Sequence, residues 1–381
     1  MNAYYRWRNR LEAVFYKRIL KPILFTFDPE DVHDFFLKMG SIAGRFALGR
    51  WKIRKMFGFR DQSLVQIING VSFPNPVGLS AGFDKDGVLG PIIGSVGFGF
   101  AEIGSVTARP YGGNPKPRLW RLKNSKSLGV WYGLKNLGVE QVVKNIEDSL
   151  NIPGLKKSQL VPLGISVAMT NCQENLDINK TIADYVTTFK AVEKLASYIT
   201  VNISCPNTMG GQPFLEPDNY EALLTSLDVI PTEKMVFVKI SPDLTFEQAD
   251  SLLEISGRHR IHGFICSNLT KKFEGKTISD TLPPHGGLSG KVVFPYAMDL
   301  LSCLYRKAGN KFIFIFCGGV FTADDAYQAI RQGASMVQMI TGMIFEGPQV
   351  VSEINRGLVE KLKQDGFTNV SEIIGIDNQV K

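Results

Sequence analysis

From about residue 65 onward, short apolar runs alternate with stretches whose apolar residues recur every three or four positions. A short apolar run bounded by turn residues is typical of a buried strand, and the wider spacing is typical of a helix with one buried face. The candidate strands are Pro76–Ala81, Phe100–Val106, Val161–Met169, Tyr198–Cys205, Met235–Ser241, Gly263–Asn268, Phe312–Cys317 and Met336–Thr341.

Helical patterns separate most of these strands. The clearest are Leu137–Leu150, Ile182–Lys194, Phe246–Ser256, Ala323–Gln332 and Val350–Gln364. Eight strand–helix repeats within about 300 residues indicate a (β/α)8 TIM barrel. The alternative is an open doubly wound sheet, which usually has fewer repeats and opens with a GxGxxG turn that this sequence lacks. We therefore predict an α/β barrel over residues 65–366.

Residues 1–48 have a different pattern and predict a small N-terminal helical extension. Basic and aromatic residues interleave at helical spacing over residues 1–21, and a second helix begins near Asp28, where Pro29 and two acids fit a first turn. We interpret Arg50–Arg60 as a basic link to the barrel. The first helix carries six cations against Glu12 and falls short of the ~18 apolar residues that a spanning helix needs. It suits an anionic membrane surface, although it could instead be a solvated basic helix or pack on the barrel.

Composition narrows the function classes. Of 381 residues, 44% are hydrophobic and 21% charged, which is ordinary for a globular protein. The five cysteines show no CxxC spacing and the four histidines form no HExxH motif, so we expect no metal site. The net charge is +7, but the excess lies in the amphipathic N-terminus rather than in a basic stripe. We therefore expect no nucleic-acid partner.

The run from Asn202 to Asn207 is the strongest chemical signal, because two carboxamides bracket Cys205 at the end of an apolar strand. Carboxamides both donate and accept hydrogen bonds, so a pair of them suits a planar ring with carbonyl and N–H groups. A thiol can take up a proton, since its unperturbed pKa of about 8.5 lies near working pH. The alternative is an Asn-rich turn after a strand, with an inert buried cysteine.

Other predicted strand ends suggest a phosphorylated cofactor. Glycines follow the last two strands, at Gly318-Gly319 and Gly342, where barrels often bind phosphate. Lys85 and Lys239 also stand at strand ends, and a buried cation requires a negative partner. A partly anionic, phosphorylated cofactor would meet both conditions.

Several longer motifs resemble the membrane-associated, quinone-linked (class 2) dihydroorotate dehydrogenases over nearly the whole chain. They are Asn75–Gly87 (NPVGLSAGFDKDG), Gly97–Arg121 (GFGFAEIGSVTARPYGGNPKPRLWR), Gly133–Val139 (GLKNLGV), Asn202–Thr208, Lys239–Leu244, Gly286–Gly290 and Gly342–Pro348. The resemblance implies an FMN enzyme of pyrimidine biosynthesis that oxidises dihydroorotate to orotate. It also implies that electrons pass to a membrane quinone, and that the enzyme is peripheral on the cytoplasmic face of a bacterial inner membrane.

The resemblance also assigns site residues by position. Cys205 occupies the place of the catalytic base, and Lys85, Asn202, Asn207 and Asn268 should contact the substrate. The expected flavin-binding residues are Ala81, Gly82, Lys85, Ser105, Ser166, Asn202, Lys239, Ser267, Gly290, Gly318, Gly319 and Thr341.

This chain departs from the class 2 pattern around the substrate. Cys205 replaces a serine, and Ser166 replaces a flavin-contacting asparagine. Val130 stands in place of a substrate carboxamide, and Leu134 and Leu269 are further changes. An alternative function is therefore an FMN barrel oxidoreductase acting on another cyclic amide or dihydropyrimidine. A flavin-binding protein without turnover is a third possibility, but such a protein has no reason to keep two carboxamides around a thiol.

Overall fold

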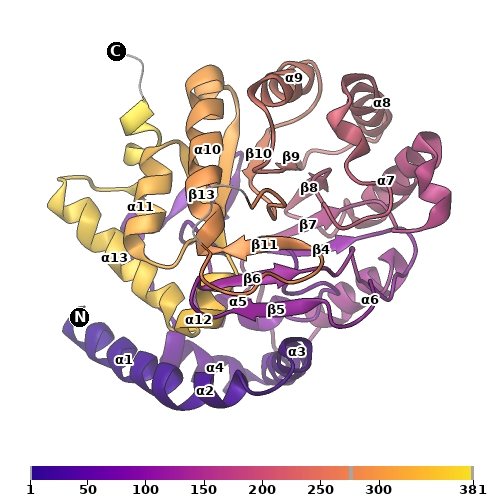
Figure 1. The fold of residues 1–381 in the computed structure, drawn as a ribbon. Coiled ribbons are helices and arrows are strands. Elements are labelled where there is room, and N and C mark those ends of the chain that lie inside the picture. Colours follow the sequence, from indigo (N-terminus) through magenta and orange to yellow (C-terminus); the bar gives the residue numbers. More distant parts are fainter. Residues whose placement is uncertain (1, 274–277, 379–381) are drawn as a thin grey trace.

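Eight parallel strands form a closed barrel in this computed structural model, which describes residues 2–273 and 278–378 (Figure 1). The strands are β3 (Val77–Leu79), β4 (Phe100–Val106), β7 (Leu163–Val167), β8 (Tyr198–Asn202), β9 (Met235–Ile240), β10 (Gly263–Cys266), β12 (Ile313–Cys317) and β13 (Ala334–Met339). Each pairs with the next in chain order, and β13 returns to β3. The predicted (β/α)8 barrel is confirmed, with every predicted strand present.

Helices follow the strands and surround the barrel. They are α5 (Gly90–Val96), α6 (Val139–Leu150), α7 (Ile178–Val192), α8 (Pro217–Asp228), α9 (Phe246–Ser256), α10 (Phe294–Ala308), α11 (Ala323–Arg331), α12 (Thr341–Glu346) and α13 (Val350–Gln364). The helices α9 and α13 have the predicted bounds. Thr245 begins α9 with a capping box, in which its hydroxyl accepts from Gln248 N and the Gln248 side chain accepts from Thr245 N.

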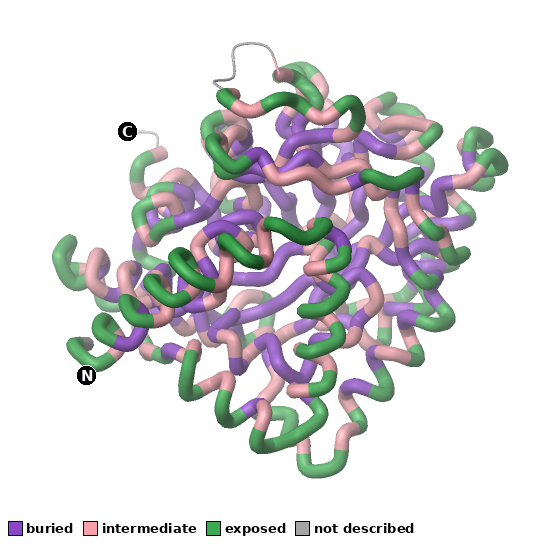
Figure 2. Tube along the Cα trace, turned by 60° about the horizontal axis from the view of Figure 1, so that its bottom comes forward, coloured by how far each residue is buried: buried purple, intermediate pink, exposed green. Residues whose placement is uncertain are grey.

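The interior of the barrel is filled at one end and open at the other. Aromatic side chains from facing strands, including Phe100, Tyr198 and Phe237, pack edge to face in the interior. The strands are almost entirely buried, whereas the outer helices present exposed turns to solvent (Figure 2). The aromatic packing stabilises the barrel at one end. The carboxyl ends of the strands, at the opposite end, are therefore available for polar functional residues.

A second sheet, which the sequence patterns did not reveal, covers the carboxyl end of the barrel. Its strands are β5 (Leu119–Leu122), β6 (Ser127–Val130) and β11 (Gly287–Gly290), paired antiparallel in the order β11-β6-β5. They belong to the loops after β4 and β10, so two distant loops are joined above the strand ends. A hairpin of β1 (Gln66–Ile68) and β2 (Val71–Phe73) precedes the barrel.

The N-terminal extension lies along one side of the barrel (Figure 1). It comprises α1 (Asn2–Phe15), a π-helical turn (Tyr16–Leu20), α2 (Lys21–Leu24), α3 (Pro29–Arg45) and α4 (Ala47–Phe57). As predicted, a helix begins at Asp28, whose carboxylate accepts from Glu30 N and Asp31 N. No helix in the described part of the chain is long and apolar enough to cross a bilayer.

The interpretation of Arg50–Arg60 as a link was wrong, because most of it belongs to α4. Its dense positive charge hid the helical period. Arg50 is 3% exposed, and its guanidinium donates to the carbonyl of Gly44 at 2.7 Å. The arginine therefore joins the end of α3 to α4 instead of facing solvent.

Candidate active site

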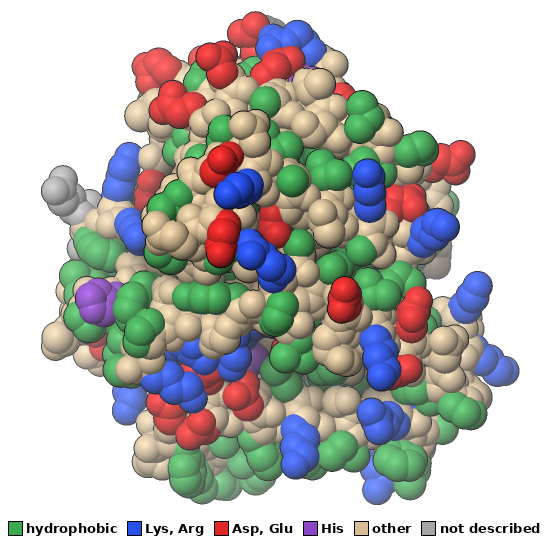
Figure 3. Space-filling model, turned by 90° about the vertical axis from the view of Figure 1, so that its right-hand side faces the viewer, with side chains coloured by type: hydrophobic (Ala, Val, Ile, Leu, Met, Phe, Trp, Pro, Cys, Tyr) green, Lys and Arg blue, Asp and Glu red, His purple; other side chains and the backbone are tan. Residues whose placement is uncertain are grey.

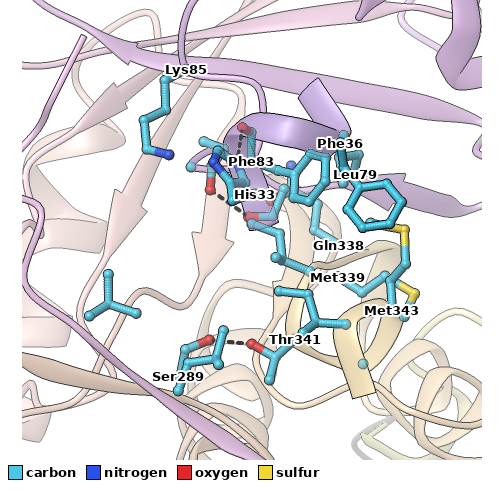
Figure 4. Close-up of a pocket in the computed structure, with 18 of the residues that line it drawn as sticks. His33, Phe36, Leu79, Phe83, Lys85, Ser289, Gln338, Met339, Thr341 and Met343 are labelled. Carbon is cyan, nitrogen blue, oxygen red and sulfur yellow. Dashed lines mark hydrogen bonds between the residues drawn. The ribbon is translucent and has the colours of Figure 1, made fainter. Parts of the chain in front are cut away.

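One cavity of about 660 Å³ runs from the carboxyl end of the barrel to the helical extension. At one end it is lined by the strand termini and at the other by apolar side chains of the extension, such as Leu24, Phe36 and Met39. Lys85 and the Ser289–Thr341 pair border the open space in Figure 4, and Phe36 lies to one side with Leu79. The cavity therefore joins a polar chamber to an apolar passage.

The structure brings nearly all the residues predicted from the sequence to this one cavity. Those that line it are Ala81, Gly82, Lys85, Ser105, Asn202, Cys205, Asn207, Lys239, Ser267, Asn268, Gly290, Gly318, Gly319 and Thr341. Ser166 is fully buried outside the lining, and its hydroxyl lies 2.8 Å from that of Ser105. Its contact with the cavity is therefore indirect.

Two buried lysines place positive charge in the chamber. Lys239 is 4% exposed and donates to the Ser80 hydroxyl at 3.3 Å. The Lys85 ammonium lies 4.3 Å from the centre of the Tyr132 ring. Burial, with a contribution from Lys135, lowers the pKa of Lys85 to about 8. Both lysines contact neutral groups here, so an anionic ligand in the chamber would be favoured.

The asparagines form a hydrogen-bonded network along the chamber wall. Asn202 donates to Ser105 Oγ at 2.8 Å and accepts from Ser204 N at 3.1 Å. Asn268 donates to Ser204 Oγ at 3.0 Å. Asn207 donates to the Val130 carbonyl at 2.9 Å, while its Oδ1 is buried with no hydrogen-bond partner among the described residues. Asn207 thus offers an unused acceptor, which suits a ligand N–H group.

Cys205 is partly buried. It is the residue after Ser204, which belongs to this network. Burial raises the pKa of its thiol to about 11, although the backbone N–H of Asn207 and the charge of Lys271 lower it. The sequence-based argument assumed a pKa near 8.5. In this environment the thiol holds its proton at neutral pH, so it must lose that proton to serve as a base.

Glycine backbones shape the part of the cavity where we expect a phosphorylated cofactor. Gly290 and Gly319 have positive φ values of 101° and 73°. A Cβ at Gly319 would lie 2.8 Å from the Gly290 carbonyl oxygen, so a side chain there would push the two loops apart. At Gly82, with φ of 106°, a Cβ would meet only Ile340 at 3.9 Å and would enter the cavity. These positions leave room for a large planar ligand.

The unusual segment 130–134 does not obstruct the chamber. Val130, Tyr132 and Leu134 line the cavity, whereas Trp131 packs against His285 with ring centres 4.4 Å apart. Leu134 has a φ of 70°, which is rare for a branched side chain and common near binding sites. An apolar surface therefore replaces the missing carboxamide at Val130.

The apolar passage has its own polar residues near the chamber. His33 on α3 donates from Nε2 to the carbonyl of Phe83 at 2.8 Å, a contact drawn in Figure 4. Burial, with the nearby Lys85 charge, lowers the pKa of His33. Arg121 on β5 lies 4.6 Å from the centre of the Phe25 ring. The passage can therefore admit an apolar ligand that carries polar atoms at one end.

Sequence reasoning missed a polar layer within the barrel. Gln338 on β13 lines the cavity and donates to the fully buried Glu102 at 2.9 Å. Glu102 also accepts from Thr200 at 3.1 Å. The signal was present as single polar residues inside apolar strands, because alternate strand residues point inward. Glu102 and Gln338 lie inside their strands, whereas the site was expected at the strand ends.

Comparisons with known proteins agree with this arrangement. A sequence model of the family described as "Dihydroorotate dehydrogenase" matches residues 63–362. The chain belongs to this family, in its class 2, quinone-linked branch. The dihydroorotate dehydrogenase (quinone) of Crocosphaera subtropica is 35% identical over 341 residues, covering 86% of this chain and 88% of that protein. That of Christiangramia forsetii is 35% identical and covers 91% and 99%.

Solved structures of the family share the fold. Ligand-free dihydroorotate dehydrogenase from Eimeria tenella has a TM-score of 0.82 at 28% identity, over 93% of this chain and all of that one. The same enzyme in complex with ferulenol has a TM-score of 0.80 and covers 93% and 96%. The class 2 resemblance noted in the sequence is therefore confirmed, and the family is flavin-dependent.

Proposed function

We propose that the protein is a quinone-linked dihydroorotate dehydrogenase, which uses FMN to oxidise dihydroorotate to orotate in pyrimidine biosynthesis. The observation that supports this most directly is the continuous cavity, which joins a chamber of carboxamides and lysines to an apolar passage. The relatives' shared name favours dihydroorotate over another cyclic amide as substrate.

The chamber residues suit FMN. Gly82, Gly290 and Gly319 would let the backbone approach FMN closely, and Lys239 would balance the negative charge of FMN. When bound, FMN supplies the hydride acceptor of the reaction. Lys85, Asn202, Asn207 and Asn268 would orient the substrate ring.

Cys205 would take the proton from the substrate ring carbon at its Sγ. The site must first lower the thiol pKa from about 11, and a deprotonated sulfur can be stabilised by the Asn207 backbone N–H and the Lys271 charge. Trp131 packs on His285 and does not line the cavity, and the second sheet of β5, β6 and β11, which lines part of it, would shield the chamber from solvent.

The extension would admit quinone and contact the membrane. Its helices expose a row of large apolar side chains, which are Tyr4, Trp7, Leu11, Phe15, Ile19, Ile23, Phe35, Met39, Phe46 and Trp51. Such a surface at the apolar end of the cavity suits a peripheral protein on a bacterial inner membrane. The division into a region 1–48 and a barrel 65–366 is part of this proposal. On the face drawn in Figure 3, acidic and basic side chains intermingle, unlike a nucleic-acid-binding stripe.

Anaerobic reduction tests the proposal. The protein is purified in mild detergent, bound FMN is identified by its visible absorption, and dihydroorotate is added without oxygen. Rapid bleaching, followed by recovery of colour with a quinone, is the expected result. A yellow protein that bleaches with dithionite but not with dihydroorotate would contradict the proposed substrate.

A further inference from the structure

A hydrogen-bonded path of buried groups runs from the helical extension to the segment after β8. Glu30 on α3 accepts from Arg118 Nε at 2.9 Å and from Nη2 at 2.7 Å. Arg118 Nη1 donates to the Asn114 carbonyl at 2.8 Å, and Asn114 Nδ2 donates to the Asn207 carbonyl at 3.1 Å. All four residues are at most 8% exposed. Solvent therefore cannot easily replace any partner along the path.

The first link is a buried ion pair. Burial raises the pKa of Glu30, but hydrogen bonds from Arg118 and Lys135 outweigh this and lower it to about 2. The carboxylate is thus charged throughout the neutral range. Removing one member of a buried pair leaves the other charge without compensation, which is strongly unfavourable. The position of Arg118 therefore depends on α3 being docked.

Asn114 is the junction between this pair and the substrate side of the cavity. Its backbone N–H donates to the Tyr132 carbonyl at 3.0 Å, and its Oδ1 accepts from Tyr111 at 2.9 Å. Asn171, 3.4 Å from the same oxygen, accepts from Met209 N at 2.8 Å. The segment 207–209 is therefore held at Asn207 by the loop that contains Arg118, and at Met209 by Asn171, which lies in the loop after β7 and contacts Asn114.

We propose that Arg118 and Asn114 are positioning residues, which hold the Cys205–Asn207 segment in its binding geometry when Glu30 docks α3 on the barrel. The substrate readout below rests on the proposed function, but the structural readout does not. The helical extension then sets the geometry of the substrate chamber as well as forming the apolar passage. The side-chain amide of Asn207 also donates to the Val130 carbonyl. Holding the Asn207 backbone in place therefore also orients its Oδ1, which has no partner among the described residues.

Hydrogen exchange on the flavin-loaded protein tests the path without turnover. Glu30→Gln keeps the side-chain size but removes the charge. The matched control is Lys116→Gln, because Lys116 is an exposed cation 3.6 Å from Glu30, more distant than Arg118 and Lys135, and lies off the path. We expect exchange in residues 203–212 to accelerate about tenfold in Glu30→Gln and in Asn114→Ala, and to stay at the wild-type rate in Lys116→Gln. Equal exchange in Glu30→Gln and Lys116→Gln would overturn the proposal.

Substrate binding provides the second readout. Asn114→Ala should weaken orotate binding about tenfold, measured by the change in flavin absorption, and leave the quinone KM unchanged. The Glu30→Gln/Asn114→Ala double variant should bind no worse than Asn114→Ala, since both interrupt one path. Additive losses would contradict the coupling. If the wild-type protein does not bind orotate, the proposed function is contradicted. The hydrogen-exchange data still decide whether the hydrogen-bonded path holds the segment after β8.

Discussion

Asn207 donates its side-chain amide to the main-chain carbonyl of Val130 at 2.9 Å. Position 130 thus takes part in the substrate chamber through its backbone while its side chain is apolar. The carboxamide of Asn207 is oriented by the protein, and only its oxygen is left for a ligand. Restoring a carboxamide at position 130 should add a polar contact without moving Asn207.

Val130→Asn should therefore strengthen orotate binding by about tenfold or more, because a hydrogen bond to a charged or strongly polar group contributes about 1.5–3 kcal/mol. Titration of the flavin spectrum with orotate measures the change. Val130→Leu is the control, since it changes volume without adding a polar group. Equal or weaker binding in Val130→Asn would show that Val130 does not face the orotate.

Cys205→Ala should keep FMN bound but abolish its reduction by dihydroorotate, because the proton acceptor is lost. In the wild type, the rate of flavin reduction should rise about tenfold per pH unit above pH 7. The thiolate fraction increases in this way as long as the pH stays below the pKa of about 11. Stopped-flow absorption measures both effects. A pH-independent rate, or undiminished reduction in Cys205→Ala, would remove Cys205 from this role.

Lys85 should make orotate binding weaken as the pH rises, whereas the rate of flavin reduction should increase. Its pKa is lowered to about 8 by burial, so the ammonium loses its proton, and its attraction for an anion, as pH rises through that value. Orotate affinity should therefore fall between pH 7 and 9. Lys85→Met should bind orotate weakly at every pH and lose this dependence. A dependence that persists in Lys85→Met must come from another group.

The extension should carry the membrane affinity. Phe46, between α3 and α4 of the extension, is 62% exposed, whereas Phe246 is 67% exposed at the start of α9 on the barrel. Phe46→Ser should reduce flotation with anionic vesicles, because it removes apolar area from the contact. The Phe246→Ser variant should float with the vesicles to the same extent as the wild-type protein. Equal losses in both variants would indicate non-specific adsorption.

The barrel could be predicted from the sequence because each of its strands is a buried apolar run, and clear helical periods separate most of these runs. The gathering of the strand-end residues around one cavity could be predicted for the same reason, since a barrel brings those ends to one face. The pKa of Cys205 could not, because it depends on burial by loops distant in the sequence. Neither could the Glu30–Arg118 pair, whose partners lie 88 residues apart.

The contact between the first and last helices also affects the order of folding. Arg8 on α1 donates to Ser352 on α13 at 2.8 Å, a bond between residues 344 positions apart. At a synthesis rate of about 5–20 residues per second, the first helix is made roughly 20–70 s before its partner. During that interval the barrel is not yet present to cover the apolar face of the first helix. Lipid cannot cover that face either until the chain reaches a bilayer. A ribosome-bound chaperone or early contact with the membrane would therefore protect the nascent chain from aggregation.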